Sequence, residues 1–141
     1  IWSTSGGRPS EDYTAHQGRI RALAFSPDGK QLASSGEDGK VHIWSCDSRR
    51  GRDLPRRQTK MFTLVFCGPD YLATGGSDNL IRLWDLATGE EVGRLSGHQG
   101  SVVSLDSNGQ VLVSGSYDTV VRIWTIKDRV AKIPRPAVEL K

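Results

Sequence analysis

Three side chains in the last third of the sequence have the types used for nucleophilic hydrolysis. His98, Ser114 and Asp118 could supply a general base, a hydroxyl nucleophile and a carboxylate that orients the base. The hydroxyl and the aspartate, however, recur at intervals of 40 residues along the chain. The recurring pairs are Ser34 with Asp38, Thr74 with Asp78, and Ser114 with Asp118. Because a single active site would not repeat at a fixed interval, this pattern argues against a catalytic triad.

Metal and phosphate sites are not indicated either. His16, His42 and His98 are far apart and form no HxxxH set, while Cys46 and Cys67 lack a second thiol at metal-ligand spacing. No glycine-rich phosphate loop follows a strand and opens a helix. The sequence therefore predicts a protein that is not an enzyme and needs no cofactor. Its two cysteines are those of a reduced, cytoplasmic protein.

Composition narrows the class of protein further. The chain has 141 residues, of which 36% are hydrophobic and 25% charged, which is typical of a folded globular domain. Its apolar runs are far shorter than the roughly 20 residues that a membrane helix needs. The first residues of this sequence also lack the pattern of a signal peptide. We therefore expect no contact with a membrane.

The four tryptophans reveal an internal repeat. Trp2, Trp44, Trp84 and Trp124 are separated by 42, 40 and 40 residues, and each follows isoleucine or leucine. An aspartate lies six residues before each of the last three. A repeat of this length is typical of a protein built from stacked supersecondary units.

Each repeat is predicted to contain short strands joined by tight turns. Pairs such as Asp38-Gly39 and Asn108-Gly109 are strong hairpin signals between runs of apolar and β-branched residues. The predicted strands are residues 20–25, 31–35 and 41–44; 62–66, 71–74 and 81–84; and 102–105, 111–114 and 121–124. No segment has helical periodicity of useful length, so the sequence predicts an all-β fold.

Two units carry the fullest version of the repeat. They read His16…Leu32-Ala33-Ser34…Asp38-Gly39…Ile43-Trp44 and Gly97-His98…Ser114-Gly115-Ser116…Asp118…Ile123-Trp124. These units resemble the WD-repeat β-propeller family, and the resemblance extends from Ile1 to Lys127. Only Trp84-Asp85 is a literal Trp-Asp pair, the first unit has Ala15-His16 in place of Gly-His, and Arg57 stands where the second unit should have its histidine.

The resemblance implies four-stranded antiparallel blades that form part of a ring of seven or eight blades. The implied divisions are residues 1–10 as the end of a preceding blade, 11–50, 51–90 and 91–127 as three repeats, and 128–141 as an exit tail. Because a partial ring leaves blade faces uncovered, we expect the remaining blades to come from a longer parent chain or from self-association.

The resemblance also implies a structural role for the recurring polar residues. In WD-repeat blades a tryptophan indole, a serine or threonine hydroxyl, a histidine and the turn aspartate form one hydrogen-bonded tetrad. The implied members are Trp44, Ser34, His16 and Asp38; Trp84, Thr74 and Asp78, without a histidine; and Trp124, Ser114, His98 and Asp118. Such a buried network satisfies its own polar groups.

In this family the usual partner surface is one end of the ring, near the mouth of the channel. The resemblance places three positions from each repeat there, and we call these nine residues the channel-mouth surface. They are Arg19, Arg21 and Glu37; Lys60, Phe62 and Ser77; and Ser101, Val103 and Tyr117. Arginine, phenylalanine and tyrosine are residue types suited to binding a protein or a peptide.

One feature departs from the repeat, and we call it the basic loop, residues 49–60. Its basic side chains are Arg49, Arg50, Arg52, Arg56, Arg57 and Lys60, against one acid, Asp53. Two interpretations remain open, an anion-binding site or a solvated connection between blades. The absence of aromatic residues from the loop disfavours nucleic acid.

The sequence therefore predicts a non-enzymatic scaffold that binds protein or peptide, as the docking or sensing region of a larger signalling protein. The alternative is an anion-binding module that uses the basic loop to bind nucleic acid or phosphate groups.

Overall fold

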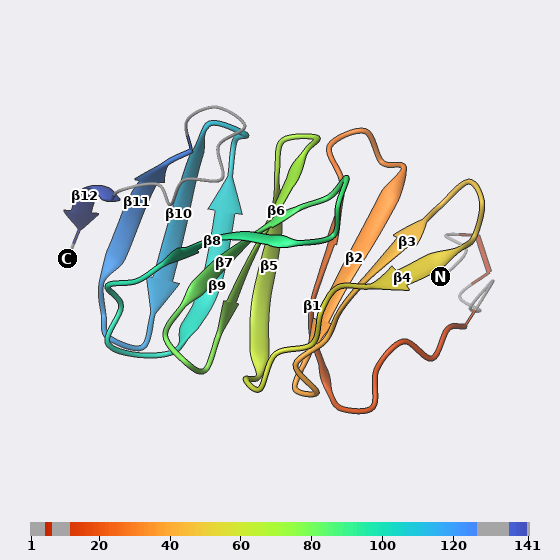
Figure 1. Ribbon diagram of the computed structural model, residues 1–141, viewed down its shortest axis with the longest axis horizontal. Coiled ribbons are helices and arrows are strands. Elements are labelled where there is room, and N and C mark those ends of the chain that lie inside the picture. The colour runs from red at the N-terminus through yellow and green to blue at the C-terminus, as the bar shows by residue number, and fades with distance from the viewer. Residues whose placement is uncertain (1–4, 7–11, 127–135, 141) are drawn as a thin grey trace.

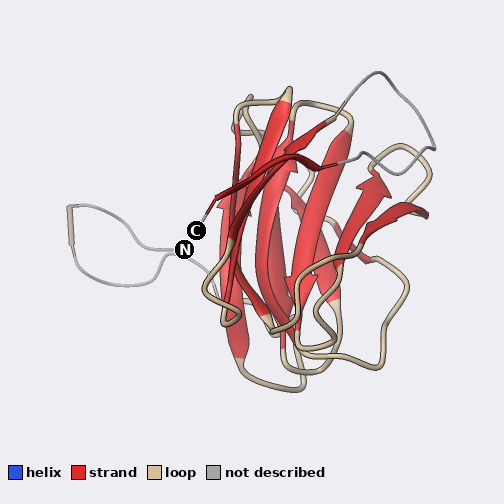
Figure 2. Cartoon of the chain, turned by 90° about the vertical axis from the view of Figure 1, so that its left-hand side faces the viewer, coloured by secondary structure: helices blue, strands red, loops and turns tan. Residues whose placement is uncertain are grey.

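The computed structural model describes residues 5–6, 12–126 and 136–140, which contain strands, turns and loops but no helix (Figure 2). Twelve strands in this part form three four-stranded antiparallel sheets. The first sheet contains β1 (Ile20–Phe25), β2 (Gln31–Gly36), β3 (Val41–Ser45) and β4 (Gly51–Asp53). The second contains β5 (Met61–Cys67), β6 (Tyr71–Gly76), β7 (Ile81–Asp85) and β8 (Glu91–Leu95). The third contains β9 (Val102–Ser107), β10 (Val111–Ser116), β11 (Val121–Thr125) and β12 (Pro136–Leu140).

Within each sheet the strands are paired in chain order, and the second sheet lies between the other two (Figure 1). This arrangement confirms the all-β expectation and the four-stranded antiparallel blade. Tight turns close the hairpins, and the β2–β3, β6–β7 and β10–β11 turns each place one residue at positive φ. These residues are Gly39, Asn79 and Thr119, with φ of 77°, 68° and 69°.

Two hydrophobic clusters join the sheets face to face. Between the first and second sheets, Phe66 and Trp84 pack against Val41 and Ile43. The second and third sheets are joined by a cluster that includes Trp124. Because side chains alternate along a strand, β5 contributes Leu64 and Phe66 to one cluster while Val65 and Cys67 belong to the other. The second sheet is therefore packed on both of its faces.

The first sheet has one uncovered apolar face. Leu23 and Phe25 on β1 are 64% and 65% exposed, although the matching residues Leu64 and Phe66 on β5 are buried. Trp44 points to the same face, where the ring of Tyr13 lies 4.2 Å from its own. The predicted end of a preceding blade, residues 1–10, falls almost entirely outside the described residues.

The fourth strands depart from the sequence interpretation in two places. Residues 49–60 are not one loop, because Gly51–Asp53 forms β4 and pairs with β3. Residues 128–141 are not only an exit tail, because Pro136–Leu140 forms β12 and pairs with β11. The second and third predicted repeats, 51–90 and 91–127, therefore begin at the fourth strand of one sheet and continue into the first three strands of the next. The Gly-Arg-Asp sequence of β4 has no apolar pattern to mark a strand, whereas in β12 Val138 and Leu140 alternate with Glu139, but Pro134 and Pro136 argue against a strand there.

Candidate functional site

In the third sheet the four expected polar residues form a continuous hydrogen-bonded chain. The indole Nε1 of Trp124 donates to Ser114 Oγ at 2.9 Å. Ser114 Oγ lies 2.7 Å from His98 Nε2, and His98 Nδ1 lies 2.7 Å from Asp118 Oδ2. Because a carboxylate only accepts, Nδ1 carries a hydrogen and donates to Asp118, so in the neutral ring Nε2 accepts from the Ser114 hydroxyl. This series of hydrogen bonds links Trp124 on β11 to Asp118 in the β10–β11 turn.

Backbone groups complete the site around Asp118. The N–H groups of Gln99 and Val120 donate to its carboxylate at 2.9 Å each. Burial alone would raise the pKa of Asp118, but hydrogen bonds from Gln99, His98 and Val120 hold it below its ordinary value. The carboxylate is thus the charged end of a satisfied network.

The first sheet repeats only part of this chain. His16 Nε2 lies 2.7 Å from Ser34 Oγ, and His16 Nδ1 lies 3.1 Å from Asp38 Oδ1. Trp44 is not joined to Ser34 among the hydrogen bonds of the described residues; its ring instead contacts Tyr13 and His42. The physical reason is that Trp44 lies on the uncovered face of the first sheet, whereas Trp84 and Trp124 are enclosed between sheets.

Serine, histidine and aspartate are linked here in the order found in a hydrolytic triad. This site differs from a triad because the serine is buried and already hydrogen-bonded. Ser114 and His98 are only 2% and 6% exposed, and the Ser114 oxygen already accepts the Trp124 indole. A substrate carbonyl therefore has no approach to the hydroxyl. These three residues therefore have a structural role: they satisfy one another's hydrogen bonds in a buried, low-dielectric site.

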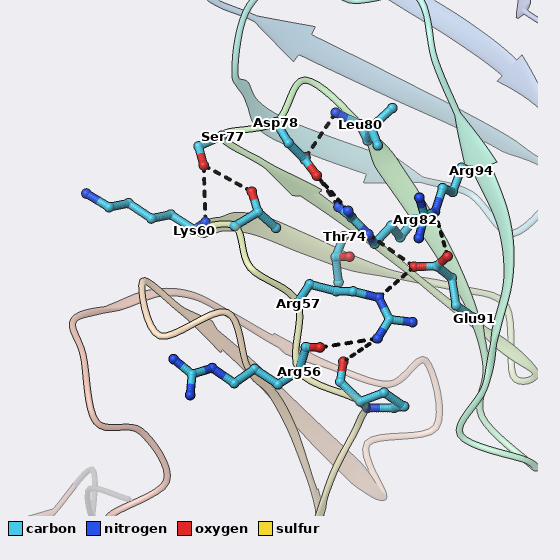
Figure 3. Close-up of polar contacts among 12 residues, drawn as sticks. Arg56, Arg57, Lys60, Thr74, Ser77, Asp78, Leu80, Arg82, Glu91 and Arg94 are labelled. Atoms are coloured by element: carbon cyan, nitrogen blue, oxygen red, sulfur yellow. Dashed lines mark hydrogen bonds and ion pairs between the residues drawn. The ribbon is translucent and has the colours of Figure 1, made fainter.

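The second sheet replaces the histidine chain with a network of charges (Figure 3). Trp84 Nε1 donates to Thr74 Oγ1 at 2.9 Å. Arg57, at the position of the missing histidine, places its guanidinium carbon 5.1 Å from the centre of the Trp84 ring. Its Nε donates to Glu91 Oε1 at 3.1 Å. The basic side chain therefore anchors the segment before β5 to the second sheet.

Glu91 is the centre of this network. Besides Arg57, it contacts Arg94, whose Nε donates to Oε2 at 2.7 Å, and Arg82, whose Nε lies 3.1 Å from Oε1. The Arg82 contact is an ion pair without hydrogen-bond geometry at Nε. Arg82 also donates twice to the turn residue Asp78, at 2.6 and 3.2 Å. Asp78 thus pairs with arginine where Asp38 and Asp118 pair with histidine.

The nine residues of the channel-mouth surface lie at the same end of the three sheets. In each sheet the backbone N–H of the turn residue donates to the carbonyl of the residue before the first strand. The bonds run from Glu37 to Arg19, from Ser77 to Lys60 and from Tyr117 to Ser101, at 2.9, 2.9 and 3.1 Å. The same main-chain hydrogen bond, formed once in each sheet, therefore gives the three sets of residues equivalent positions.

A β-bulge in each first strand aims the middle member of each set. Ile20 pairs with Gly36 and Ala22 with Ser35, so Arg21 is the extra residue. Phe62 and Val103 are the extra residues at the same point of β5 and β9. A bulge takes its residue out of the regular alternation and re-aims the side chain. Neither the amino-acid composition nor the apolar pattern of the strands predicts these bulges.

Two of these sets meet across the first and second sheets. Arg21 Nη1 donates to Glu37 Oε1 at 3.2 Å, and the Arg21 guanidinium carbon lies 5.2 Å from the centre of the Phe62 ring. Tyr117, from the third sheet, is 73% exposed. Lys60 and Ser77 are exposed beside them, while Ser101 and Val103 are half-buried. The surface thus combines aromatic, cationic and polar groups.

The arginines of the basic loop do not form one patch. Arg49 and Arg50 lie in the turn between β3 and β4, at the end of the sheet opposite the channel-mouth surface. Arg52 is on β4 and donates to the carbonyl of Leu86, and Arg57 is paired with Glu91. Arg56 lies at the channel-mouth end, where its Nε donates to the carbonyl of Asp38 at 2.8 Å.

Other kinds of site find little support in the described part of the chain. No cluster of three or more His, Cys, Asp or Glu side chains there could hold a metal ion. Nor does any helix among those residues have the length and apolarity to cross a membrane.

Comparison with known proteins agrees with the repeat and the sheets. Residues 7–45, 65–85 and 89–125, more than half of the chain, match the family described as WD domain, G-beta repeat. Periodic tryptophan protein 2 homolog of Caenorhabditis elegans is 30% identical over 87% of this chain and 19% of its own length. Guanine nucleotide-binding protein subunit beta of Zea mays is 30% identical over 90% of this chain and 38% of its own.

A solved structure supports the same fold. The crystal structure of the computationally designed Ika4 protein matches with a TM-score of 0.72 at 29% identity, over 82% of this chain and 71% of that one. The chain spans less than half the length of the two curated relatives. The tryptophan repeat, the three stacked antiparallel sheets and these matches together show that the chain belongs to the WD-repeat family and folds as part of a β-propeller.

Proposed function

We propose that this chain is a non-enzymatic, cytoplasmic scaffold that binds a protein or peptide through the channel-mouth surface. The observation that carries the proposal is the repeated bulge, which occurs at Arg21, Phe62 and Val103 near the same end of three neighbouring sheets. A fold can repeat its core for stability alone. Three re-aimed side chains at one end serve recognition, because bulges commonly accompany functional sites.

The chemistry of the surface supports a polypeptide partner. Tyr117 presents a large amphipathic ring to solvent, and Arg21 is held over Phe62 with its charge balanced by Glu37. Aromatic and arginine side chains dominate the energetics of protein interfaces. Because Arg21 is already held by Glu37 and Phe62 before binding, less of its conformational entropy is lost on association.

The relatives support a role within assemblies. The matching maize protein is by name a subunit, and this chain spans only part of each curated relative. We propose that the chain is likewise the docking region of a larger signalling protein. Further blades, from a parent chain or from other copies, would cover the exposed face at Leu23 and Phe25.

Variant capture tests the proposal. Proteins retained by the immobilised chain are identified by mass spectrometry, and capture is repeated with Arg19→Ala/Tyr117→Ala. Lys30→Ala/Asn108→Ala serves as the matched control, because both residues are exposed at the opposite end of their sheets. We expect the first pair to lose the partner while its stability stays within about 0.5 kcal/mol of the parent. Undiminished capture by that pair would contradict the proposal.

A further inference from the structure

A groove of about 390 Å³ lies where the first and second sheets meet at the channel-mouth end. We call it the junction groove; it is lined by residues 37–38, 56–60 and 77. It therefore joins parts of both features predicted from the sequence. Lys60 and Ser77 come from the channel-mouth surface, and Arg56 comes from the basic loop.

The walls of the groove are fixed by main-chain contacts. Arg56 Nε donates to the carbonyl of Asp38 at 2.8 Å, and the Arg57 N–H donates to the carbonyl of Gly39 at 3.0 Å. A Cβ at Gly39 would lie 1.9 Å from the Arg57 carbonyl oxygen, so only glycine permits this approach. The β2–β3 turn and the segment before β5 are thus locked together without any ligand.

Both acids in the groove are already matched with partners of their own. Glu37 pairs with Arg21 at 3.2 Å. The Asp38 carboxylate turns away to His16 and accepts the Gln17 N–H at 2.9 Å. Burial would raise the pKa of Asp38, but those hydrogen bonds, with that of the Lys40 N–H, hold it below its ordinary value. Neither acid therefore forms an ion pair with Arg56 or Lys60 among the described residues.

Two cations remain available. Lys60 Nζ makes no ion pair or hydrogen bond among the described residues, and Arg56 uses only Nε, which leaves its terminal nitrogens to donate. Figure 3 shows the two side chains projecting to the same side. The hydroxyls of Thr59 and Ser77 are hydrogen-bonded to each other at 3.0 Å, which leaves one O–H to donate beside Lys60. Arg57 is less available, because its Nε donates to Glu91 and its Nη1 donates to the carbonyls of Pro55 and Arg56.

We propose that the junction groove binds an anionic group, a carboxylate or a phosphate, carried by the partner polypeptide. The proposal rests on the proposed function and names the chemistry of its partner. Arg56 donates to the anion from a planar fork, Lys60 supplies a second charge, and the free hydroxyl of the Thr59–Ser77 pair donates to a remaining oxygen. Phe62, two residues after Lys60, then contacts a flanking residue of the same segment.

Fluorescence anisotropy with labelled probes tests this assignment. The probes are an oligoglutamate peptide, a Gly-Ser peptide carrying one phosphoserine, the same Gly-Ser peptide without phosphate, and single-stranded oligothymidylate. We expect an anionic peptide to bind and the uncharged one not to bind, and whichever anionic peptide binds more tightly identifies carboxylate or phosphate as the source. Affinity should fall as salt rises from low to physiological concentration.

Two double variants of equal charge localise the binding. Arg56→Ser/Lys60→Ser removes the available cations, and each lost charge-assisted contact should weaken binding about tenfold. Lys30→Ser/Arg50→Ser removes the same charge at the far end and should weaken binding less than about threefold. Circular dichroism confirms that both variants are folded.

Three outcomes would overturn the assignment: equal weakening by both double variants, no binding of either anionic peptide, or tighter binding of oligothymidylate than of the peptides. These outcomes leave the proposed function separately testable. If Arg19→Ala/Tyr117→Ala still loses its captured partner while no anionic peptide binds, the channel-mouth surface stands and the junction groove does not.

Discussion

Replacing Glu91 with glutamine tests the charge network that substitutes for histidine in the second sheet. Glu91 is matched by three arginines whose side chains are exposed to different degrees, 50% for Arg94, 26% for Arg57 and 6% for Arg82. The exposed Arg94 pair contributes less than about 1 kcal/mol. In the variant Arg82 is still paired with Asp78. Losing its contact with Glu91 therefore costs less than the roughly 3–5 kcal/mol of leaving a buried charge without any partner. We expect Glu91→Gln to lower the free energy of unfolding by about 2 kcal/mol near neutral pH.

The effect should depend on pH in a defined direction. Burial favours the neutral acid and would raise the pKa of Glu91, but hydrogen bonds from Arg94 and Arg57 hold it below its ordinary 4.5. A carboxylate with a depressed folded-state pKa stabilises the fold above its unfolded pKa, and this stabilisation is lost as pH falls through the folded pKa. Glutamine does not titrate. The difference between parent and variant should therefore be constant above about pH 5 and shrink at lower pH.

Urea unfolding, followed by tryptophan fluorescence at several pH values, measures this difference. Glu90→Gln is the matched control, because Glu90 is exposed and its carboxylate makes no ion pair among the described residues. The control should change stability by less than about 0.5 kcal/mol. Equal effects of the two substitutions, or a Glu91→Gln difference that persists undiminished at acidic pH, would refute the reasoning.

Three further predictions concern backbone and thiol chemistry. Thr119 is a β-branched residue at φ 69° on an exposed turn, so Thr119→Asn should raise the free energy of unfolding by about 0.5–1 kcal/mol; a decrease in denaturation midpoint would contradict this. Gly39→Ala should cost well over the roughly 1–2 kcal/mol of Gly29→Ala, because both have positive φ but only the first Cβ meets a carbonyl oxygen; equal melting temperatures would exclude the steric account. Burial raises the pKa of the Cys67 thiol to about 11, so an Ellman assay at pH 8 should label the exposed Cys46 and reach Cys67 only after unfolding; two fast equivalents would show otherwise.

The repeated hairpins could be predicted because the types and spacing of their side chains specify them. The strand expected at 20–25 is observed as β1, and the strands expected at 41–44 and 81–84 are each one residue longer at their carboxyl ends. Turn residues and alternating apolar residues specify these hairpins directly. By contrast β4, with sequence Gly-Arg-Asp, has exposed residues and no apolar side chain; it is held to β3 by main-chain pairing and by the contacts of the Asp53 carboxylate with Lys40 and His42. No apolar pattern marks such a strand.

The candidate site was predictable only in part for a similar reason. The family resemblance located the channel-mouth positions, but the bulges at Arg21, Phe62 and Val103 arise from strand register. The basic loop was treated as one charged unit, yet three-dimensional packing divides it. Arg57 lies over Trp84, Arg49 and Arg50 lie in the turn at the far end, Arg52 is on β4, and Arg56 is bound to the β2–β3 turn. Charge counted along the sequence does not show which cations are already paired.

Site-specific photocrosslinking tests most directly the central claim that the channel-mouth surface is where the partner binds. Tyr117 is replaced by a benzoyl-phenylalanine residue, which preserves an exposed aromatic ring, and the same residue is placed at exposed Asn108 in the turn at the opposite end of the third sheet. Both variants are irradiated with the protein identified by capture. The account predicts a covalent adduct from position 117 and none from position 108. An adduct only from position 108 would place the partner at the other end of the sheets and contradict the account.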